Sequence, residues 1–438
     1  GPQWIDPRSG EIIQGDIIWW HNVIELLQTW RFVQTAAVDP EAREKQLSDA
    51  LMGDAIRYAV AHEMGHVLGL QHNMRASYAV PTDSLRSASF TQKYGTTASI
   101  MDYSRNNYVA QPGDKEKGVV LTPPRLGIHD FFAIKWGYKP IFEATTPQDE
   151  LPTLNQWFLE KGNNPFFIHA GTAVSAVVPD PSAQSDALGN DLIKSARYGI
   201  ANIKLITNHL IKWTMTDGDH FELLQKRWDA ITKHYFRITN LTLSYLGGAY
   251  TYNGVYGQHE AKLVPVQSAK QKETIRFVLN ELVHSQWLNN SEITQFLGAS
   301  TNDITQWQSN VIDNMLGNFV LTRIVSNEPL YHKHAYTLSA YLQDVDTEIW
   351  KLTAKPTLSH FDRHIQMAYV DKLCRLIEPF VLGTNKAESL QANHTVWASA
   401  VASQLVVTRA KLSQLITTQV QNSGHYRLII RKIDQLLK

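Results

Sequence analysis

Three histidines in the stretch AHEMGHVLGLQHN, residues 61–73, have the spacing of metal ligands. His62 and His66 are four residues apart, so on an α-helix both imidazoles lie on one face, about one turn apart. Two ligands of one tetrahedral ion need this arrangement. Gly69 can take the left-handed conformation that ends a helix, which would let His72 turn back toward the same ion. The alternative, a buried helix that only happens to contain histidines, explains neither the glycine nor the third histidine.

Three neutral nitrogen ligands leave one position of a tetrahedral zinc ion for water, as in catalytic rather than structural zinc sites. Such an ion lowers the pKa of water from about 15.7 to about 7, so a nucleophile is available near neutral pH. Glu63 directly follows the first histidine. We expect its carboxylate to lie beside the water and to act as the general base, as in other HExxH sites. The sequence therefore predicts one catalytic zinc ion and a hydrolytic reaction.

A second stretch, SIMDYS at residues 99–104, follows the histidines. On its own, Met101 would be interpreted as a core residue. Together with the histidine motif, the stretch resembles the methionine turn of the metzincin zinc peptidases. The resemblance implies that Met101 forms an apolar floor beneath the metal without binding it. It also implies that Tyr103 takes the place of the tyrosine that, in astacin-like and serralysin-like metzincins, approaches the zinc and stabilises the oxyanion.

Four further stretches extend the resemblance to the bacterial Met-zincin family of large zinc-dependent metallopeptidases. They read DPRSGEII, WRFVQTAAVDP, SFTQKYGTTASIMDY and LGIHDFFAIKWGY, and they span residues 6–138. The resemblance implies a zinc endopeptidase with a peptide or protein substrate, placed in the periplasm, at the cell surface or outside the cell. The residue after the third histidine differs among metzincin subfamilies and is Asn73 here, so the substrate preferences of astacins, matrixins and serralysins are not carried over.

The segment GEIIQGDIIWW, residues 10–20, mixes β-branched and polar residues after a turn and predicts a strand. In metzincins a strand in this region pairs with extended substrate, because backbone groups at a sheet edge bind any peptide. We assign this role to Gly15, Asp16, Ile17 and Ile18, with an ordinary sheet strand as the alternative. Only about 50 residues precede the zinc helix, and the chain begins without a methionine or a leader. We therefore expect an N-terminally incomplete catalytic domain, an unpaired strand and weak peptidase activity.

The predicted fold class is α+β, with a metzincin-like catalytic domain over residues 1–142 and a mainly helical extension over residues 143–438. The polar stretch EATTPQDELPT after residue 142 is a candidate linker. Apolar residues at steps of three and four predict helices in the extension, as in the series Ile193, Ala196, Ile200, Ile203, Ile206 and Leu210. The pair Asn253 and Gly254, between tyrosines, predicts a small β-hairpin.

The composition of the 438-residue chain limits its partners. Lysine plus arginine (41) equals aspartate plus glutamate (41), which argues against nucleic acid as a partner. The sequence contains no run of about 18 apolar residues that would predict a membrane span. The single cysteine, Cys374, rules out a thiolate zinc cluster. The oligomeric state is left open.

The alternative to a peptidase is a protein-binding module that uses the helical part of the chain and keeps the zinc fold as a scaffold. Glu63 argues against this alternative, because a scaffold needs no general base.

Overall fold

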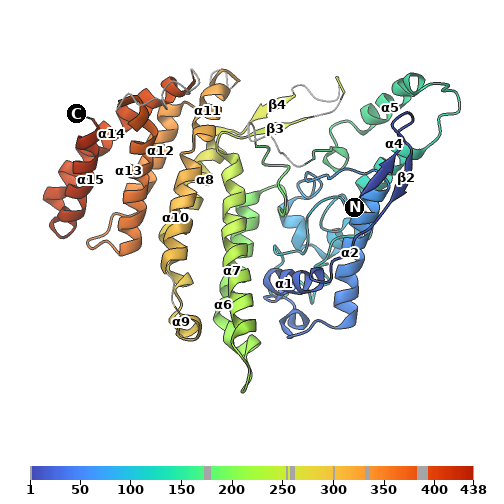
Figure 1. Ribbon diagram of the computed structural model, residues 1–438, viewed down its shortest axis with the longest axis horizontal. Helices are drawn as coiled ribbons and strands as arrows, with labels where there is room; N and C mark the ends of the chain where they lie inside the picture. The colour runs from blue at the N-terminus through green and yellow to red at the C-terminus, as the bar shows by residue number, and fades with distance from the viewer. Residues whose placement is uncertain are drawn as a thin grey trace. The chain divides into compact units, whose positions relative to one another are not determined.

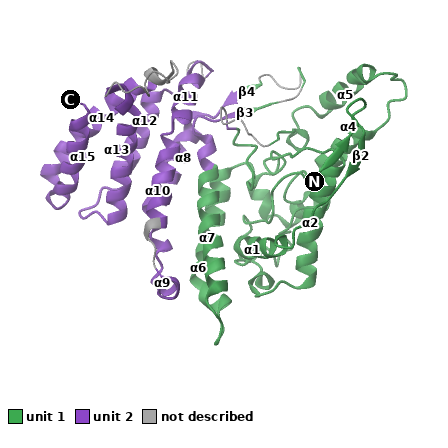
Figure 2. Ribbon diagram, in the orientation of Figure 1, with its two compact units in different colours: residues 1–174, 180–241, 250–263 green, residues 175–179, 242–249, 264–438 purple. Residues whose placement is uncertain are grey.

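The computed structural model describes residues 2–171, 179–252, 255–256, 262–298, 301–330, 336–381 and 393–437 (Figure 1). Within these ranges the chain is mostly helical and has two small sheets of two strands each, which confirms the α+β class. It divides into two compact units (Figure 2). Unit 1 comprises residues 1–174, 180–241 and 250–263, and unit 2 comprises residues 175–179, 242–249 and 264–438. Among the described helices, none is long and apolar enough to cross a bilayer.

Unit 1 contains two strands, seven α-helices and three short 3₁₀ helices in its described residues. In chain order they are β1 (Gln3–Ile5), β2 (Ile12–Gly15), α1 (Val23–Thr35), η1 (Pro40–Arg43), α2 (Asp49–Val67), η2 (Thr82–Arg86), α3 (Ala88–Tyr94), α4 (Ile128–Tyr138), α5 (Pro147–Lys161), η3 (Pro165–Phe167), α6 (Leu192–Thr214) and α7 (Glu222–Leu241).

The helix α2 carries the histidine motif, as predicted. It begins at Ser48, whose hydroxyl accepts a hydrogen bond from the backbone of Leu51. It ends where Gly69 adopts a φ of +82°. There the backbone N–H of Gly69 donates to His66 O at 2.8 Å and that of Leu70 donates to Gly65 O at 2.9 Å. This pair of bonds is the Schellman arrangement, and it turns the chain back on itself after the second histidine.

The strand predicted over residues 10–20 is shorter than expected and is not unpaired. Only β2 (Ile12–Gly15) is extended, and it pairs antiparallel with β1, with Gln3 opposite Gly15. Gly15, the last residue of β2, lies against α2: a Cβ there would lie 2.9 Å from a methyl group of Val67. Beyond it, the backbone N–H of Asp16 donates to Pro2 O at 3.1 Å, and the Asp16 side chain accepts a hydrogen bond from the Gln14 amide at 3.0 Å.

The long helices of unit 1 confirm the apolar periodicity. Every member of the series from Ile193 to Leu210 is buried on α6, and α6 packs against α7 while α1 packs against both. Unit 1 therefore continues well past residue 142. The boundary between the units does not coincide with the end predicted for the catalytic domain, and that end stays a prediction.

The candidate linker after residue 142 is partly helical. The helix α5 begins at Pro147, and the carboxylate of Asp149 accepts hydrogen bonds from the backbone N–H groups of Thr145 (3.1 Å) and Thr146 (2.9 Å). Proline at the first helical position and an acidic residue that satisfies free N–H groups both favour a helix start.

Unit 2 is a set of helices, as the sequence predicted for this part of the chain. Its elements are η4 (Thr242–Tyr245), α8 (Ser268–Val283), η5 (Ser285–Leu288), α9 (Ser291–Leu297), α10 (Thr301–Met315), α11 (Asn318–Asn327), α12 (Leu338–Leu352), α13 (His360–Val381), α14 (Asn393–Thr418), η7 (Val420–Asn422) and α15 (Ser423–Leu436). At the boundary of the units, β3 (Ala249–Thr251) pairs with β4 (Leu263–Pro265). The predicted turn residues Asn253 and Gly254 lie outside the described residues.

Candidate metal centre

The fold brings the three predicted ligands together. His62 and His66 project from the last two turns of α2, and the turn at Gly69 returns His72 to them. The ligand atoms of the three histidines all lie within 4.8 Å of one another, and His66 Nε2 lies 3.0 Å from His72 Nε2. Imidazole nitrogens gathered in this way are the donor set that zinc prefers.

Backbone carbonyls hold two of these imidazoles in the tautomer that a metal needs. His62 Nδ1 lies 2.7 Å from Ile100 O, and His66 Nδ1 lies 2.9 Å from Leu70 O. Because a carbonyl oxygen can only accept, each Nδ1 carries the proton and each Nε2 presents a lone pair. These two rings therefore aim unprotonated nitrogens at the centre.

The buried Nε2 atom of His62 provides the test of whether a metal fits. It has no hydrogen-bond partner among the described residues, and an unsatisfied buried acceptor is costly. Burial lowers the pKa of His62 to about 4, and burial also lowers the pKa of His72. Both rings are therefore neutral at pH 7, which is the form that binds a metal. The residues present fit a zinc ion.

Met101 lies directly beneath the metal-binding helix. It is 2% exposed, and its sulfur occupies the space where a Cβ on Gly65 of α2 would be. Met101 O also accepts a hydrogen bond from the backbone of Asn73 at 3.0 Å, next to the third histidine. The methionine is thus packed against the helix between two of the ligands, in the position that the methionine-turn resemblance implies.

Two buried carboxylates fix the turn that contains Met101, and sequence reasoning missed both. Asp130 of α4 accepts hydrogen bonds from Ile100 N at 3.0 Å and Ser99 Oγ at 2.5 Å. Asp102, within the turn, accepts from Ser77 N at 2.5 Å. Burial raises the pKa of Asp130, and it raises the pKa of Asp102 to about 8. A possible signal in the sequence was the placement of Asp130 in the first turn of an otherwise apolar helix.

Glu63 and Tyr103 line one cavity together with His62. The cavity has a volume of about 340 Å³, and its floor along α2 includes Ala55 and Ala59, the two small residues that leave space beside the histidines. The hydroxyl of Tyr103 lies 2.9 Å from His72 Nε2. Burial raises the pKa of Tyr103, so that this hydroxyl keeps its proton and remains a hydrogen-bond donor. Glu63, Tyr103 and His62 therefore share one cavity, and Tyr103 connects it to His72.

Of the four residues predicted to bind substrate backbone, Gly15 lies beside the helix that carries two of the histidines, and the four do not form one strand. Gly15 is the last residue of β2 and contacts Val67, the neighbour of His66. Asp16, Ile17 and Ile18 continue beyond the strand without a ladder. The hairpin is tied to the helix as well, because the side-chain amide of Gln3 donates to His66 O.

A three-histidine centre on a helix, with a glutamate beside it and a methionine beneath it, is the arrangement of metzincin zinc peptidases. A model of the Met-zincin family matches residues 44–357, so the chain belongs to that family. This membership indicates a zinc metallopeptidase in general and agrees with the three-histidine cluster. No curated protein and no solved structure matches the chain.

Proposed function

We propose that this protein is a zinc-dependent endopeptidase whose metal is held by His62, His66 and His72. The observation that carries the proposal is the convergence of three imidazole nitrogens, two of them fixed as lone-pair donors by backbone carbonyls, in the same cavity as Glu63. A bound zinc ion supplies Lewis acidity, which polarises the scissile carbonyl and acidifies water.

Glu63 is the proposed general base. Its carboxylate lines the cavity next to His62, where it can accept a proton from the attacking water and then deliver that proton to the leaving amine. General acid–base catalysis of this kind contributes about 10²- to 10⁴-fold to the rate. Met101 does not take part in this chemistry; it supports the helix that carries the base and two ligands.

Tyr103 is proposed to stabilise the oxyanion. Its hydroxyl now donates toward His72 Nε2, the atom that would bind the metal. That nitrogen has one lone pair and cannot serve both partners. When the ligand nitrogen is engaged, the hydroxyl is released at the edge of the cavity and can donate instead to the charge that develops on the carbonyl oxygen.

The edge of β2 is proposed to guide the substrate backbone. One edge of this strand pairs with β1, and no strand covers the other edge among the described residues. Because β2 rests on α2 beside His66, a peptide paired along Gly15 would pass close to the ligands. Asp16, Ile17 and Ile18 extend this path beyond the strand.

The test is the substitution Glu63→Gln. The amide cannot accept the proton of water, so we expect peptide hydrolysis to fall by about 10²- to 10⁴-fold, while elemental analysis still finds about one zinc per chain. Asp49→Asn is the matched control, since Asp49 is an exposed acidic residue in the first turn of the same helix; it should leave turnover unchanged. Near-parental turnover of the Glu63 variant with its zinc intact would refute the assignment. A zinc-loaded parent that cleaves no peptide of a mixed library would favour the binding-module alternative.

A further inference from the structure

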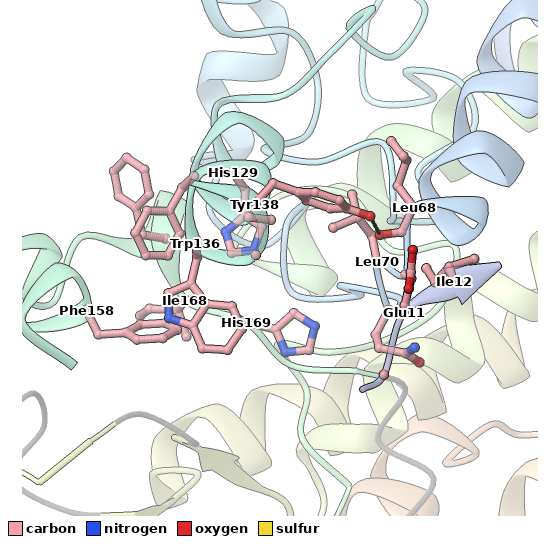
Figure 3. A pocket seen from close by; sticks show the side chains of 17 residues that line it. Glu11, Ile12, Leu68, Leu70, His129, Trp136, Tyr138, Phe158, Ile168 and His169 are labelled. Carbon is pink, nitrogen blue, oxygen red and sulfur yellow. Dashed lines mark hydrogen bonds between the residues drawn. The ribbon is translucent and has the colours of Figure 1, made fainter. Parts of the chain in front are cut away.

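A second cavity, of about 780 Å³, lies at the C-terminal end of α2 (Figure 3). It is lined by residues 68–71, by residues 10–12 before and within β2, by one face of α4, by Phe158 of α5 and by residues 167–169. Figure 3 shows Trp136 and Phe158 on one side of the cavity and Glu11 on the other. Nothing in the proposed chemistry uses this space.

The cavity borders the metal centre. Leu70 lines it, and the carbonyl of the same residue orients His66. Gln71 also lines it and directly precedes His72. His169 on the cavity wall hydrogen-bonds the backbone of His72. The three ligands themselves do not line this cavity, which adjoins the centre through the segment that leads to His72.

The two cavities flank the ligands along the direction of α2. The cavity that holds Glu63 is bordered by residues 54–63 of the helix, which precede or include the first ligand. The larger cavity is bordered by the turn that follows His66. A peptide laid along this direction would have one cavity on each side of the ligands.

The walls of the larger cavity are aromatic and already packed edge to face. Phe132 meets Phe158 at 5.4 Å and Phe167 at 5.5 Å between ring centroids, with interplanar angles of 78° and 77°. Trp136 meets Phe158 at 5.8 Å and remains 40% exposed, so part of its ring is free to take another partner. His129 is buried, and burial lowers its pKa to about 4, so this ring brings no charge.

Two polar groups on the aromatic side of the cavity are already engaged, and Glu11, Gln71 and His169 also line it. The hydroxyl of Tyr138 already donates to Leu68 O at 2.8 Å, and the ring of His129 contacts Phe166 O at 3.2 Å through Nδ1. An apolar ring that packs against the side of Trp136 and Phe158 leaves the bonds of Tyr138 and His129 intact, and Glu11 lies on the other side of the cavity (Figure 3).

We propose that this cavity is a specificity subsite for an aromatic residue of the substrate, on the side of the scissile bond opposite the Glu63 cavity. The inference rests on the proposed peptidase function. Incoming rings would join the edge-to-face cluster of α4 and α5, an arrangement that aromatic pairs prefer. The volume of the cavity is within the range of ligand pockets, about 300–1,000 Å³. It is larger than the volume of one aromatic side chain, so the cavity also accommodates part of the neighbouring substrate residue.

The experiment compares two peptides that differ at one position, tryptophan against alanine. The position is chosen from the cleavage profile of a mixed peptide library with the zinc-loaded parent protein. The ratio of kcat/KM for the two peptides is then measured in Trp136→Ala, which removes part of the wall, and in Ala133→Phe, which fills the cavity. Phe131→Ala is the matched control: Phe131 is on the same helix, 64% exposed, and does not line the cavity. A ratio cancels any loss of folded protein.

We expect the parent to prefer the tryptophan peptide by about tenfold, from the free energy of an aromatic pair and its buried area. Both cavity variants should lower that ratio by about five- to tenfold, and the control should keep it. An unchanged ratio in both cavity variants, a library profile without an aromatic preference, or an equal loss in the control would each overturn the subsite while leaving the peptidase function in place. If the zinc-loaded parent cleaves neither peptide, the proposed function is wrong and the subsite falls with it.

Discussion

Replacing Gly65 with alanine should destabilise this protein, although alanine favours helices. Gly65 is buried in α2, and an added Cβ would overlap the sulfur of Met101. The intrinsic gain from glycine to alanine within a helix is about 0.5–1 kcal/mol. Overpacking of a tight core costs about 1–3 kcal/mol. The difference is an expected net loss of up to about 2.5 kcal/mol in the free energy of unfolding.

The assay is urea unfolding at one fixed zinc concentration, because a metal that binds only the folded state adds its own stabilisation. Gly53→Ala on the same helix is the matched control. Nothing lies within 4 Å of a Cβ at that position, so this variant should gain about 0.5–1 kcal/mol. The two substitutions are chemically identical and should change stability in opposite directions.

A double-mutant cycle with Met101→Ala isolates the contact itself. In the parent, loss of this buried side chain should cost about 2–5 kcal/mol. In the Gly65→Ala background the same change also relieves the overlap, so it should cost less, by a coupling energy of about 0.5–3 kcal/mol. Equal costs in both backgrounds, or a Gly65 variant as stable as the Gly53 variant, would refute the packing argument.

Three further predictions concern the ligands, the tyrosine and the turn. Alanine at any one of His62, His66 or His72 should reduce bound zinc well below one equivalent by elemental analysis, and full occupancy after one replacement would exclude that residue as a ligand. Tyr103→Phe should lower kcat by about 10²-fold with little change in KM, whereas a change in KM alone would assign the hydroxyl to substrate binding. Burial raises the pKa of Asp102 to about 8, so the folded state keeps a proton that the unfolded state has released. The free energy of unfolding should therefore fall as the pH rises from 7 to 8.5. In urea titrations Asp102→Asn should flatten this dependence, and an equal slope in both proteins would place the titration at another residue.

The ligand set could be predicted from the sequence because the information is local. The four-residue spacing of His62 and His66 fixes their common face on any helix, and the fold needs only a left-handed residue, Gly69, to return His72. The same holds for the space beside Ala55 and Ala59, which follows from helical periodicity alone. Only Met101 needed a resemblance, since a lone methionine carries no signal of what it packs against.

The support of the site could not be predicted because its partners are distant in sequence. Asp130 binds the turn across 30 residues, and Ser77 meets Asp102 across 25. No periodicity relates such pairs. The strand over residues 10–20 is overestimated for a related reason: β-branched residues favour an extended chain, but the length of β2 follows its pairing with β1, which residue types alone do not show.

The methionine turn acts on the metal centre through its backbone as much as through its side chain. The carbonyl of Ile100 orients His62, and the N–H of the same residue is held by Asp130. The imidazole is therefore linked to α4 by a continuous path that does not pass through the sulfur of Met101. The sulfur has a separate task, which is to fill the space left by Gly65 under α2. Because the two tasks belong to different atoms, the packing beneath the helix and the direction of the ligand are independent features, and the glycine is as much a part of this centre as the methionine.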